Sequence, residues 1–156
     1  MSSPAPLSTD HRTIGFNCAV DSLNEWLIRR ALKNEHCGGS RTYVVCDGNP
    51  VVGYYAIAAG SIARSKILGR TRRNMPGPIP ALILGRLAVD HHCQGTGIGR
   101  GLLKDALARS MNVSEQVGTH VLIVHALNDK AEAFYRKHGF SVCPQIPNTL
   151  VLSLND

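Results

Sequence analysis

The apolar positions in the first part of the chain predict one helix and one β-hairpin. Within residues 21–33 the apolar side chains recur at the spacing of an amphipathic helix, for which Asp21 is the expected N-cap. These apolar residues are Leu23, Trp26, Leu27 and Ala31. Residues 41–46 and 51–59 are strand-like runs on either side of the turn sequence 47–50, so we expect them to pair as an antiparallel hairpin.

The rest of the chain alternates between strand-like and helical patterns. Four further strands are predicted from apolar runs, at residues 82–89, 121–124, 140–143 and 149–154. The run 121–124 is apolar throughout, which is typical of a central strand covered on both faces. Helical patterns span residues 98–111 and 131–138, and Gly139 suits the C′ position that ends the second helix. This order of elements predicts an α/β protein with one sheet flanked by helices.

Length and cysteine content limit the kind of protein further. A chain of 156 residues suits one domain with one core, and we expect its Ser- and Pro-rich residues 1–10 to form a loose tail. The five cysteines are odd in number and form no C-x-x-C pair, which predicts reduced thiols. Neither a secretory signal pattern nor an apolar run of about 20 residues is present. We therefore predict a cytoplasmic protein with no membrane partner.

A glycine-rich segment, residues 94–101, lies between the predicted strand 82–89 and the predicted helix 98–111. A strand followed by a glycine turn and a helix N-terminus presents backbone N–H groups and a positive dipole end to a phosphate. The dinucleotide pattern G-x-G-x-x-G/A fails because Arg100 or Leu102 occupies its third small position. The P-loop pattern fails because no glycine is followed by Lys-Ser or Lys-Thr. Another kind of phosphate loop and a plain surface turn remain as explanations.

The spacing Q-x-x-G-x-G, formed by Gln94, Gly97 and Gly99, resembles the pyrophosphate-binding loop of the GNAT acetyltransferases. Further residues match the strand before this loop and the helix of the same family that follows, namely Leu87-Ala88-Val89, Asn128, Phe134-Tyr135 and Gly139-Phe140. The resemblance implies the GNAT fold. That fold has a single mixed, mostly antiparallel sheet, with helices on its faces and central parallel strands that splay apart.

The same resemblance implies that acetyl-CoA is the cosubstrate. Backbone groups around Leu87, Ala88 and Val89 would bind its pantetheine arm. The other implied cofactor contacts are Gln94, Gly95, Thr96, Gly97, Ile98, Gly99, Arg100, Asn128 and Phe134. Helix N-terminal amides and the helix dipole suit a pyrophosphate without a metal.

Tyr135 matches the position of the family's general acid. A phenol has a pKa of about 10, so it is protonated at neutral pH and can donate to a thiolate whose conjugate acid has a pKa of about 8.5. The alternative explanation is that Tyr135 is a half-buried core residue beside Phe134.

Motifs along nearly the whole chain resemble the acetyltransferase toxins of bacterial toxin-antitoxin systems. They include Phe16-x-Cys18, Ser40-Arg41-Thr42-Tyr43-Val44, Gly53-Tyr54-Tyr55, Arg73-Asn74-x-Pro76 and Leu84-Gly85-Arg86-Leu87-Ala88-Val89-Asp90. The resemblance implies transfer of acetyl to the α-amine of the amino acid on charged tRNA, which blocks translation. It also implies a ribbon-helix-helix antitoxin as partner and a homodimer. Ala19 departs from the family, which has glycine at this turn, and Cys93 stands where an aromatic residue is common.

The charge of the chain favours an anionic partner. With 17 Lys and Arg against 11 Asp and Glu, the formal net charge is +6. Acetyl-CoA is itself anionic, so this charge does not by itself indicate nucleic acid. The basic positions that could follow tRNA phosphates, or could simply be solvated charges, are Arg29, Arg30, Lys33, Arg64, Arg70, Arg72, Arg73 and Arg86. We predict tRNA contacts at Arg72, Arg73 and Arg86, because a proline-closed loop beside the cofactor strand can present them to the acceptor end.

No carboxylate stands out as a general base. Asp90 and Glu132 are candidates, but Asp90 is more readily explained as a carboxylate at a strand end or turn, and water could also carry the proton. An α-amine has a pKa of about 8 and needs a base less than a lysine does, so this absence favours an α-amine acceptor. The sequence His91-His92-Cys93 could bind a metal. However, strand alternation would separate His92 from the other two residues, so we predict no metal. Cys93 lacks an evident His-acid relay and is expected to pack under the loop rather than act as a nucleophile.

Two other functions remain open. The chain could be a GNAT enzyme that acetylates a small amine or a protein N-terminus, or a non-catalytic module that binds RNA or protein. A binding module would not need Tyr135, Gln94 and Asn128 together with the loop glycines. The basic stretch 64–73 favours tRNA over a small amine.

Overall fold

The computed structural model describes residues 1–63 and 77–154. The chain forms two compact units, one of Met1–Ala58 with Gly85–Leu107 and one of Ala59–Leu84 with Ala108–Asp156. One seven-stranded sheet has the order β1-β2-β3-β4-β5-β7-β6, and two of its strands, β3 and β4, contribute residues to both units. The sheet is mixed, because β4 and β5 run parallel whereas β2 with β3 and β5 with β7 run antiparallel. The predicted fold class is confirmed.

The predicted hairpin is the centre of the first unit. Strand β2 (Arg41–Cys46) has the predicted bounds, and β3 (Val51–Ile62) runs three residues beyond the predicted end. They pair antiparallel, with Arg41 opposite Ile57 and Val45 opposite Gly53. The turn closes with a hydrogen bond of 3.0 Å from the Asp47 N–H to the Pro50 carbonyl.

The N-terminal segment is not the loose tail that we expected. Strand β1 (Ala5–Pro6) pairs antiparallel with Val44 and Tyr43 of β2. The Cys46 N–H donates to Ser2 Oγ at 2.9 Å, and Leu7 is buried in the core. Pairing with β1 supplies hydrogen-bond partners for backbone groups on the outer edge of β2, which would otherwise be open. The short N-terminal segment thus gains both backbone hydrogen bonds and apolar contact.

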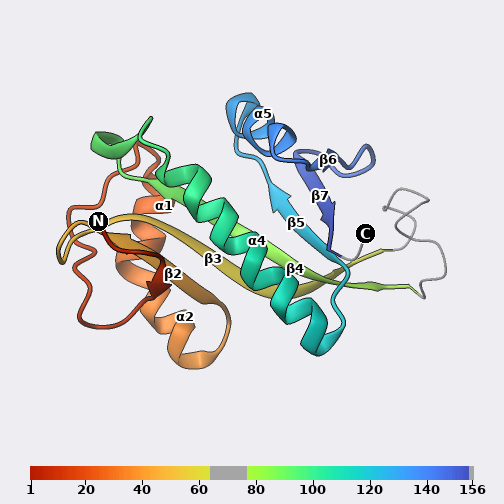
Figure 1. Ribbon diagram of the computed structural model, residues 1–156, viewed down its shortest axis with the longest axis horizontal. Coiled ribbons are helices and arrows are strands. Elements are labelled where there is room, and N and C mark those ends of the chain that lie inside the picture. Colours follow the sequence, from red (N-terminus) through yellow and green to blue (C-terminus); the bar gives the residue numbers. More distant parts are fainter. Residues whose placement is uncertain (64–76, 155–156) are drawn as a thin grey trace. The chain divides into compact units, whose positions relative to one another are not determined.

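The predicted helix consists of three consecutive helical segments, which lie beside β2 (Figure 1). They are α1 (Asp21–Glu25), the π-helical turn η1 (Trp26–Arg30) and α2 (Ala31–Cys37). All four predicted apolar residues are buried: Leu23, Trp26, Leu27 and Ala31. The predicted N-cap is wrong by one residue. The cap is Val20, and Asp21 is the first helical residue, where its charge is favourable at the positive end of the helix dipole.

Ala19, at the turn where the toxin family has glycine, is one of two non-glycine residues with positive φ in the described ranges, at +72°. An L-residue in this left-handed region costs about 1–2 kcal/mol, whereas glycine adopts it freely. Ala19 is also exposed, so its methyl group contributes little packing.

We therefore expect the substitution Ala19→Gly to stabilise the protein by roughly 0.5–1 kcal/mol, after allowing for the greater unfolded-state entropy of glycine. Urea unfolding followed by circular dichroism measures this change. The matched control is Ala108→Gly, at an exposed position inside a helix, which should destabilise by about 1 kcal/mol. A lower urea midpoint for Ala19→Gly than for the parent would contradict the claim that Ala19 strains this turn.

Strand β4 (Ile79–Val89), the 3-10 turn η3 (His91–Cys93) and helix α4 (Ile98–Val117) follow in order. The strand begins earlier and the helix ends later than predicted. In the first unit, Leu102, Leu103 and Ala106 of α4 are fully buried. A Cβ atom added at Gly53 of β3 would lie only 3.0 Å from side-chain atoms of Ile98 and Leu102, so the first turns of α4 pack directly on this strand.

The second unit holds β5 (Val121–His125), α5 (Asp129–Lys137), β6 (Ser141–Val142) and β7 (Thr149–Ser153). Figure 1 shows α5 beside β6 and β7. Val121–Val124 of β5 are all buried, as predicted for a central strand. Helix α5 is followed by Gly139, whose φ of +98° suits the predicted position of glycine after a helix.

Each unit has its own apolar cluster. In the first unit the cluster centres on Phe16, Trp26, Leu27, Val44 and Tyr54. In the second it includes Ile62, Ile79, Val121, Ile123 and Val151. All five cysteines are free thiols, in agreement with the expectation of a reduced protein. Among the residues described, no helix combines the length and the apolar character that crossing a bilayer requires.

Candidate active site

Asp90 organises the start of the glycine-rich loop. Its Oδ1 accepts the His92 N–H at 3.0 Å and its Oδ2 accepts the Asn17 N–H at 3.1 Å. The residue is nearly buried, and both of its oxygens are engaged by backbone donors. This carboxylate therefore caps the turn η3 and joins it to the segment before α1, which confirms the interpretation of Asp90 as a turn carboxylate.

The loop itself is held to the end of β4. The Gln94 side-chain amide donates to the Val89 carbonyl at 3.2 Å and to the Cys18 carbonyl at 3.5 Å. Gly95 and Gly97 have φ of +81° and +89°, a left-handed backbone conformation that glycine adopts at little steric cost. Gln94 thus fixes the position of the loop, and the two glycines shape its turn into α4.

The N-terminus of α4 offers backbone donors with no partner. The first helical hydrogen bond runs from the Gly101 N–H to the Gly97 carbonyl at 3.0 Å. The N–H groups of Ile98, Gly99 and Arg100 have no acceptor within the described part of the chain, as is usual for a first helical turn. No acidic residue occupies this turn, and the helix is 20 residues long. The geometry suits an anion of the size of a pyrophosphate.

The parallel ladder of β4 with β5 is short. It joins Ala81–Leu84 to Val121–Val124 and ends there, five residues before β4 ends. Leu87, Ala88 and Val89 belong to the part of β4 beyond this ladder. A strand that leaves its ladder can offer main-chain groups to an extended ligand, as in β-strand addition.

Tyr135 lies in the second unit, on α5. It is 7% exposed, and its ring makes edge-to-face contacts with Phe140 at 5.5 Å and Phe134 at 5.3 Å between centroids. Its hydroxyl has no hydrogen-bond partner among the residues that the structure describes. Burial raises the pKa of Tyr135 to about 12. The side chain is therefore a neutral phenol at physiological pH, held rigidly by aromatic contacts and with its proton available.

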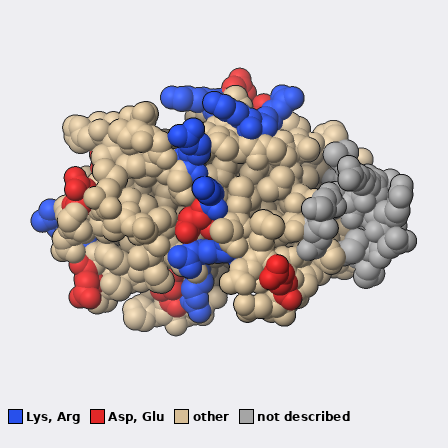
Figure 2. Space-filling model, viewed as in Figure 1, with Lys and Arg blue, Asp and Glu red and all other residues tan. Residues whose placement is uncertain are grey.

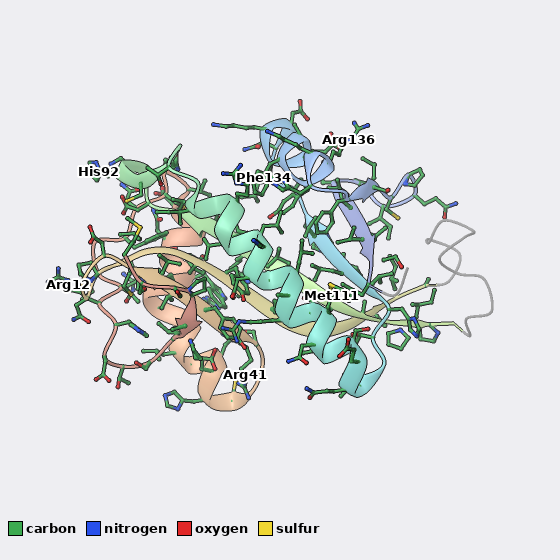
Figure 3. All side chains as sticks on the ribbon, viewed as in Figure 1. Arg12, Arg41, His92, Met111, Phe134 and Arg136 are labelled. Atoms are coloured by element: carbon green, nitrogen blue, oxygen red, sulfur yellow. The ribbon has the colours of Figure 1, made fainter. Side chains whose placement is uncertain are left out.

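Asn128 and Phe134 lie on the same helix. Asn128 is the N-cap of α5, because its Oδ1 accepts the Ala131 N–H at 2.9 Å. Phe134 is half-buried, and Figure 3 shows it on the side of α5 opposite the outward-pointing Arg136. Glu132, the other candidate base, lies in the first turn of α5.

Arg86 is held against an aromatic ring. Its guanidinium lies 4.4 Å from the ring centroid of Trp26, and Trp26 in turn stacks on Tyr54 at 5.9 Å. No carboxylate pairs with Arg86 in the part of the chain that is described. Burial lowers the pKa of Arg86, and the positive charge of Arg30 acts in the same direction. A partly desolvated cation without an anionic partner is a suitable contact for a phosphate. The sequence pattern identified Trp26 only as a core residue, because the two residues are distant in the chain.

The other two predicted tRNA contacts, Arg72 and Arg73, lie outside the described residues. The structure adds a basic group that the sequence did not single out, over α5. Figure 2 shows Lys and Arg side chains gathered there, and the exposed basic residues of the helix are Lys130, Arg136 and Lys137.

The argument from strand alternation at His91-His92-Cys93 is wrong, because these residues form the turn η3. The rings of His91 and His92 lie 3.9 Å apart, and ligand atoms of Asp90, His91 and His92 come within 4.8 Å of one another. However, His91 Nδ1 donates to the Asn17 carbonyl at 2.8 Å, and both Asp90 oxygens accept N–H groups. These hydrogen bonds explain the cluster as part of the loop support, and a metal-free site remains our prediction.

Comparison with known proteins gives the family. A model of the acetyltransferase (GNAT) domain matches residues 38–142. The chain is 43% identical over 155 residues to a tRNA-acetylating toxin of Mycobacterium tuberculosis (strain ATCC 25618 / H37Rv), covering 99% of this chain and 93% of the toxin. The chain therefore belongs to the GNAT acetyltransferase family, and the family predicted from the sequence is confirmed.

Two solved structures are similar over nearly the whole chain. The toxin AtaT in complex with acetyl-methionyl-tRNAfMet superposes with a TM-score of 0.90 at 29% identity, covering 97% of this chain and 94% of that one. A Tyr-to-Phe variant of AtaT, bound to the C-terminus of the antitoxin AtaR and acetyl-CoA, superposes with a TM-score of 0.83 at 28% identity, covering 97% and 92%. The particular relatives of this GNAT enzyme are thus acetyltransferase toxins.

Proposed function

We propose that this protein is a toxin that transfers acetyl from acetyl-CoA to the α-amine of the amino acid on charged tRNA and so blocks translation. The observation that carries the proposal is the 43% identity, over 99% of the chain, to a toxin that acetylates tRNA. The similarity to AtaT in complex with acetyl-methionyl-tRNAfMet supports the same acceptor.

Acetyl-CoA binding is assigned to the loop and to β4. The N–H groups of Ile98, Gly99 and Arg100 bind the pyrophosphate, and Gln94, Gly95, Thr96 and Gly97 shape the loop around it. Leu87, Ala88 and Val89 hydrogen-bond the pantetheine arm through their main chain, as an added strand would. Asn128 and Phe134 contact the cosubstrate from α5.

Tyr135 supplies the proton that the leaving group needs. When the amine nitrogen attacks the thioester carbonyl carbon, the C–S bond breaks and negative charge develops on the sulfur of coenzyme A. The Tyr135 hydroxyl donates its proton to this sulfur, because burial keeps the phenol neutral and no protein acceptor among the described residues competes for the proton.

The tRNA is bound by Arg72, Arg73 and Arg86. The contact between Arg86 and Trp26 supports this assignment, because an arginine fixed on an indole loses little conformational freedom when it binds a phosphate. A neutralising antitoxin of the ribbon-helix-helix type and a homodimer are further parts of the proposal. The substrate implies that the protein works in the cytoplasm, where charged tRNA is used.

The test is acetyl transfer from radiolabelled acetyl-CoA to charged tRNA by the purified protein, with and without EDTA. The expected result is label on the α-amine of the aminoacyl end and an unchanged rate in EDTA, since helix amides rather than a metal hold the pyrophosphate. Label found only on proteins or small amines would favour an ordinary GNAT enzyme. Binding of tRNA without any transfer would favour a non-catalytic module.

The substitution Gly97→Ala is expected to weaken acetyl-CoA binding about 10-fold, measured by isothermal titration calorimetry. Gly97 has a φ of +89°, and alanine there costs about 1–2 kcal/mol unless the loop moves away from the amides of α4. Gly101→Ala is the matched control, because a Cβ atom at this helical position meets nothing within 4 Å. If both variants bind acetyl-CoA as tightly as the parent, the loop assignment is wrong.

A further inference from the structure

His125 ends strand β5, whose other four residues are buried, and is itself exposed. In the parallel ladder the last pair is Leu84 with Val124, so His125 is the first residue of β5 beyond the point where β4 leaves the ladder. On its other edge, His125 stands opposite Thr149 of β7. A polar, chemically versatile side chain therefore occupies the position at which the parallel ladder ends.

Two hydrogen bonds determine which ring nitrogen of His125 carries the proton in the neutral imidazole. Thr149 Oγ1 donates to the Pro147 carbonyl at 3.0 Å and lies 3.1 Å from His125 Nδ1. A hydroxyl has one proton, and here the carbonyl accepts it, so Nδ1 must donate to Oγ1. In the neutral ring this assignment leaves Nε2 with its lone pair. Nε2 has no partner among the residues described, and a lone pair of this kind accepts a proton.

His125 and α5 lie on opposite faces of the sheet. A Cβ atom added at Gly139, just beyond the C-cap of α5, would lie 3.7 Å from Leu152 Cδ1, and Leu152 is opposite Leu122. Because side chains alternate along a strand, His125 and Thr149 point to the other face, which also carries Ile123 and Val151. Helix α5, which carries Tyr135, and the imidazole of His125 thus lie on different sides of β5.

We propose that His125 is the general base of the acetyl transfer, held in its reactive tautomer by Thr149. This inference rests on the proposed function of the chain as an aminoacyl-tRNA acetyltransferase. His125 Nε2 takes the proton that the amine nitrogen loses as it bonds to the thioester carbon. The C–S bond then breaks, Tyr135 protonates the sulfur, and solvent returns the proton from His125 to Tyr135.

The substitution His125→Asn tests the proposal, because an amide nitrogen can still donate to Thr149 Oγ1 but no basic nitrogen replaces Nε2. We expect kcat for the acetylation of charged tRNA to fall about 100-fold or more, while the Kd for acetyl-CoA stays at the parental value.

Two further variants separate the base from its support. Thr149→Val removes the acceptor for Nδ1 and should lower kcat about 10-fold, whereas Thr149→Ser should keep the parental rate. His11→Asn is the matched control, because His11 Nδ1 also takes part in a hydrogen bond, with the Ser8 N–H at 3.0 Å, in the first unit. This variant should acetylate at the parental rate.

A His125→Asn variant with the parental kcat would overturn the proposal. Loss of acetyl-CoA binding together with activity would also overturn it, because the residue would then be structural. A parent protein that does not acetylate charged tRNA would instead refute the proposed function. An active parent with an equally active His125→Asn variant refutes the base alone.

Discussion

Replacing Tyr135 with phenylalanine is expected to lower kcat for acetyl transfer to charged tRNA about 100- to 1,000-fold. The variant keeps the ring and its edge-to-face contacts with Phe134 and Phe140, so the fold of α5 should not change. Only the proton donor is lost. Because burial raises the pKa of Tyr135 to about 12, the phenol stays protonated below that pH, and the rate should show no loss from its ionisation between about pH 6 and 9.

Steady-state kinetics with charged tRNA and acetyl-CoA measure this effect, and calorimetry measures acetyl-CoA binding, which should be retained. Tyr54→Phe is a matched control, because Tyr54 is also a buried tyrosine and its hydroxyl donates to the Leu23 carbonyl at 2.7 Å. That variant should be less stable by about 1 kcal/mol and keep its kcat. Parental kcat in the Tyr135→Phe variant would remove Tyr135 from the mechanism.

Reversing the charge at Arg72 and Arg73 to glutamate is expected to raise KM for charged tRNA roughly 10- to 100-fold, with the Kd for acetyl-CoA unchanged. Each arginine that contacts a phosphate releases a counterion from the nucleic acid. The slope of log affinity against log salt should therefore become shallower by about two. Filter binding at several salt concentrations, together with kinetics, gives both quantities.

A second double variant with the same change in net charge controls for general electrostatic attraction. Arg12→Glu with Arg41→Glu alters two exposed arginines of the first unit, which Figure 3 labels. Its KM for tRNA should rise much less than that of the variant at Arg72 and Arg73. Equal effects would show that binding depends on net charge alone, and loss of acetyl-CoA binding would show that the substitutions act on the fold.

Local features of the chain were predictable because short-range chemistry decides them. The bounds of β2 follow from an apolar run that ends at a turn sequence, and Gly139 follows α5 because a helix end needs a left-handed residue. The turn η3 was not predictable from alternation. Its geometry depends on the Asp90 carboxylate, which accepts one N–H from its own turn and one from Asn17, 73 residues earlier.

The residues of the candidate site also fall into two groups, those with a local sequence signal and those that only contacts with distant residues identify. The glycine spacing at 94–101 and the position of Tyr135 indicated the cosubstrate and the acid, because these patterns are short and specific. The general base was missed because its identification depends on Thr149, which orients His125 from a neighbouring strand. The aromatic support of Arg86 was missed for a similar reason, since Trp26 lies 60 positions away on a helix.

The sequence by itself determined the family and most of the order of the strands and helices along the chain, and it predicted which residues bind acetyl-CoA and which one protonates the leaving sulfur. Periodicity, turn chemistry and glycine spacing act over a few residues, so they can be recognised without a structure. Tertiary structure alone decided where the β4–β5 ladder ends, which tautomer His125 adopts and what holds Arg86. These features arise when distant segments fold together, because a hydrogen bond or a stacked ring depends on distance in space and not on separation along the chain.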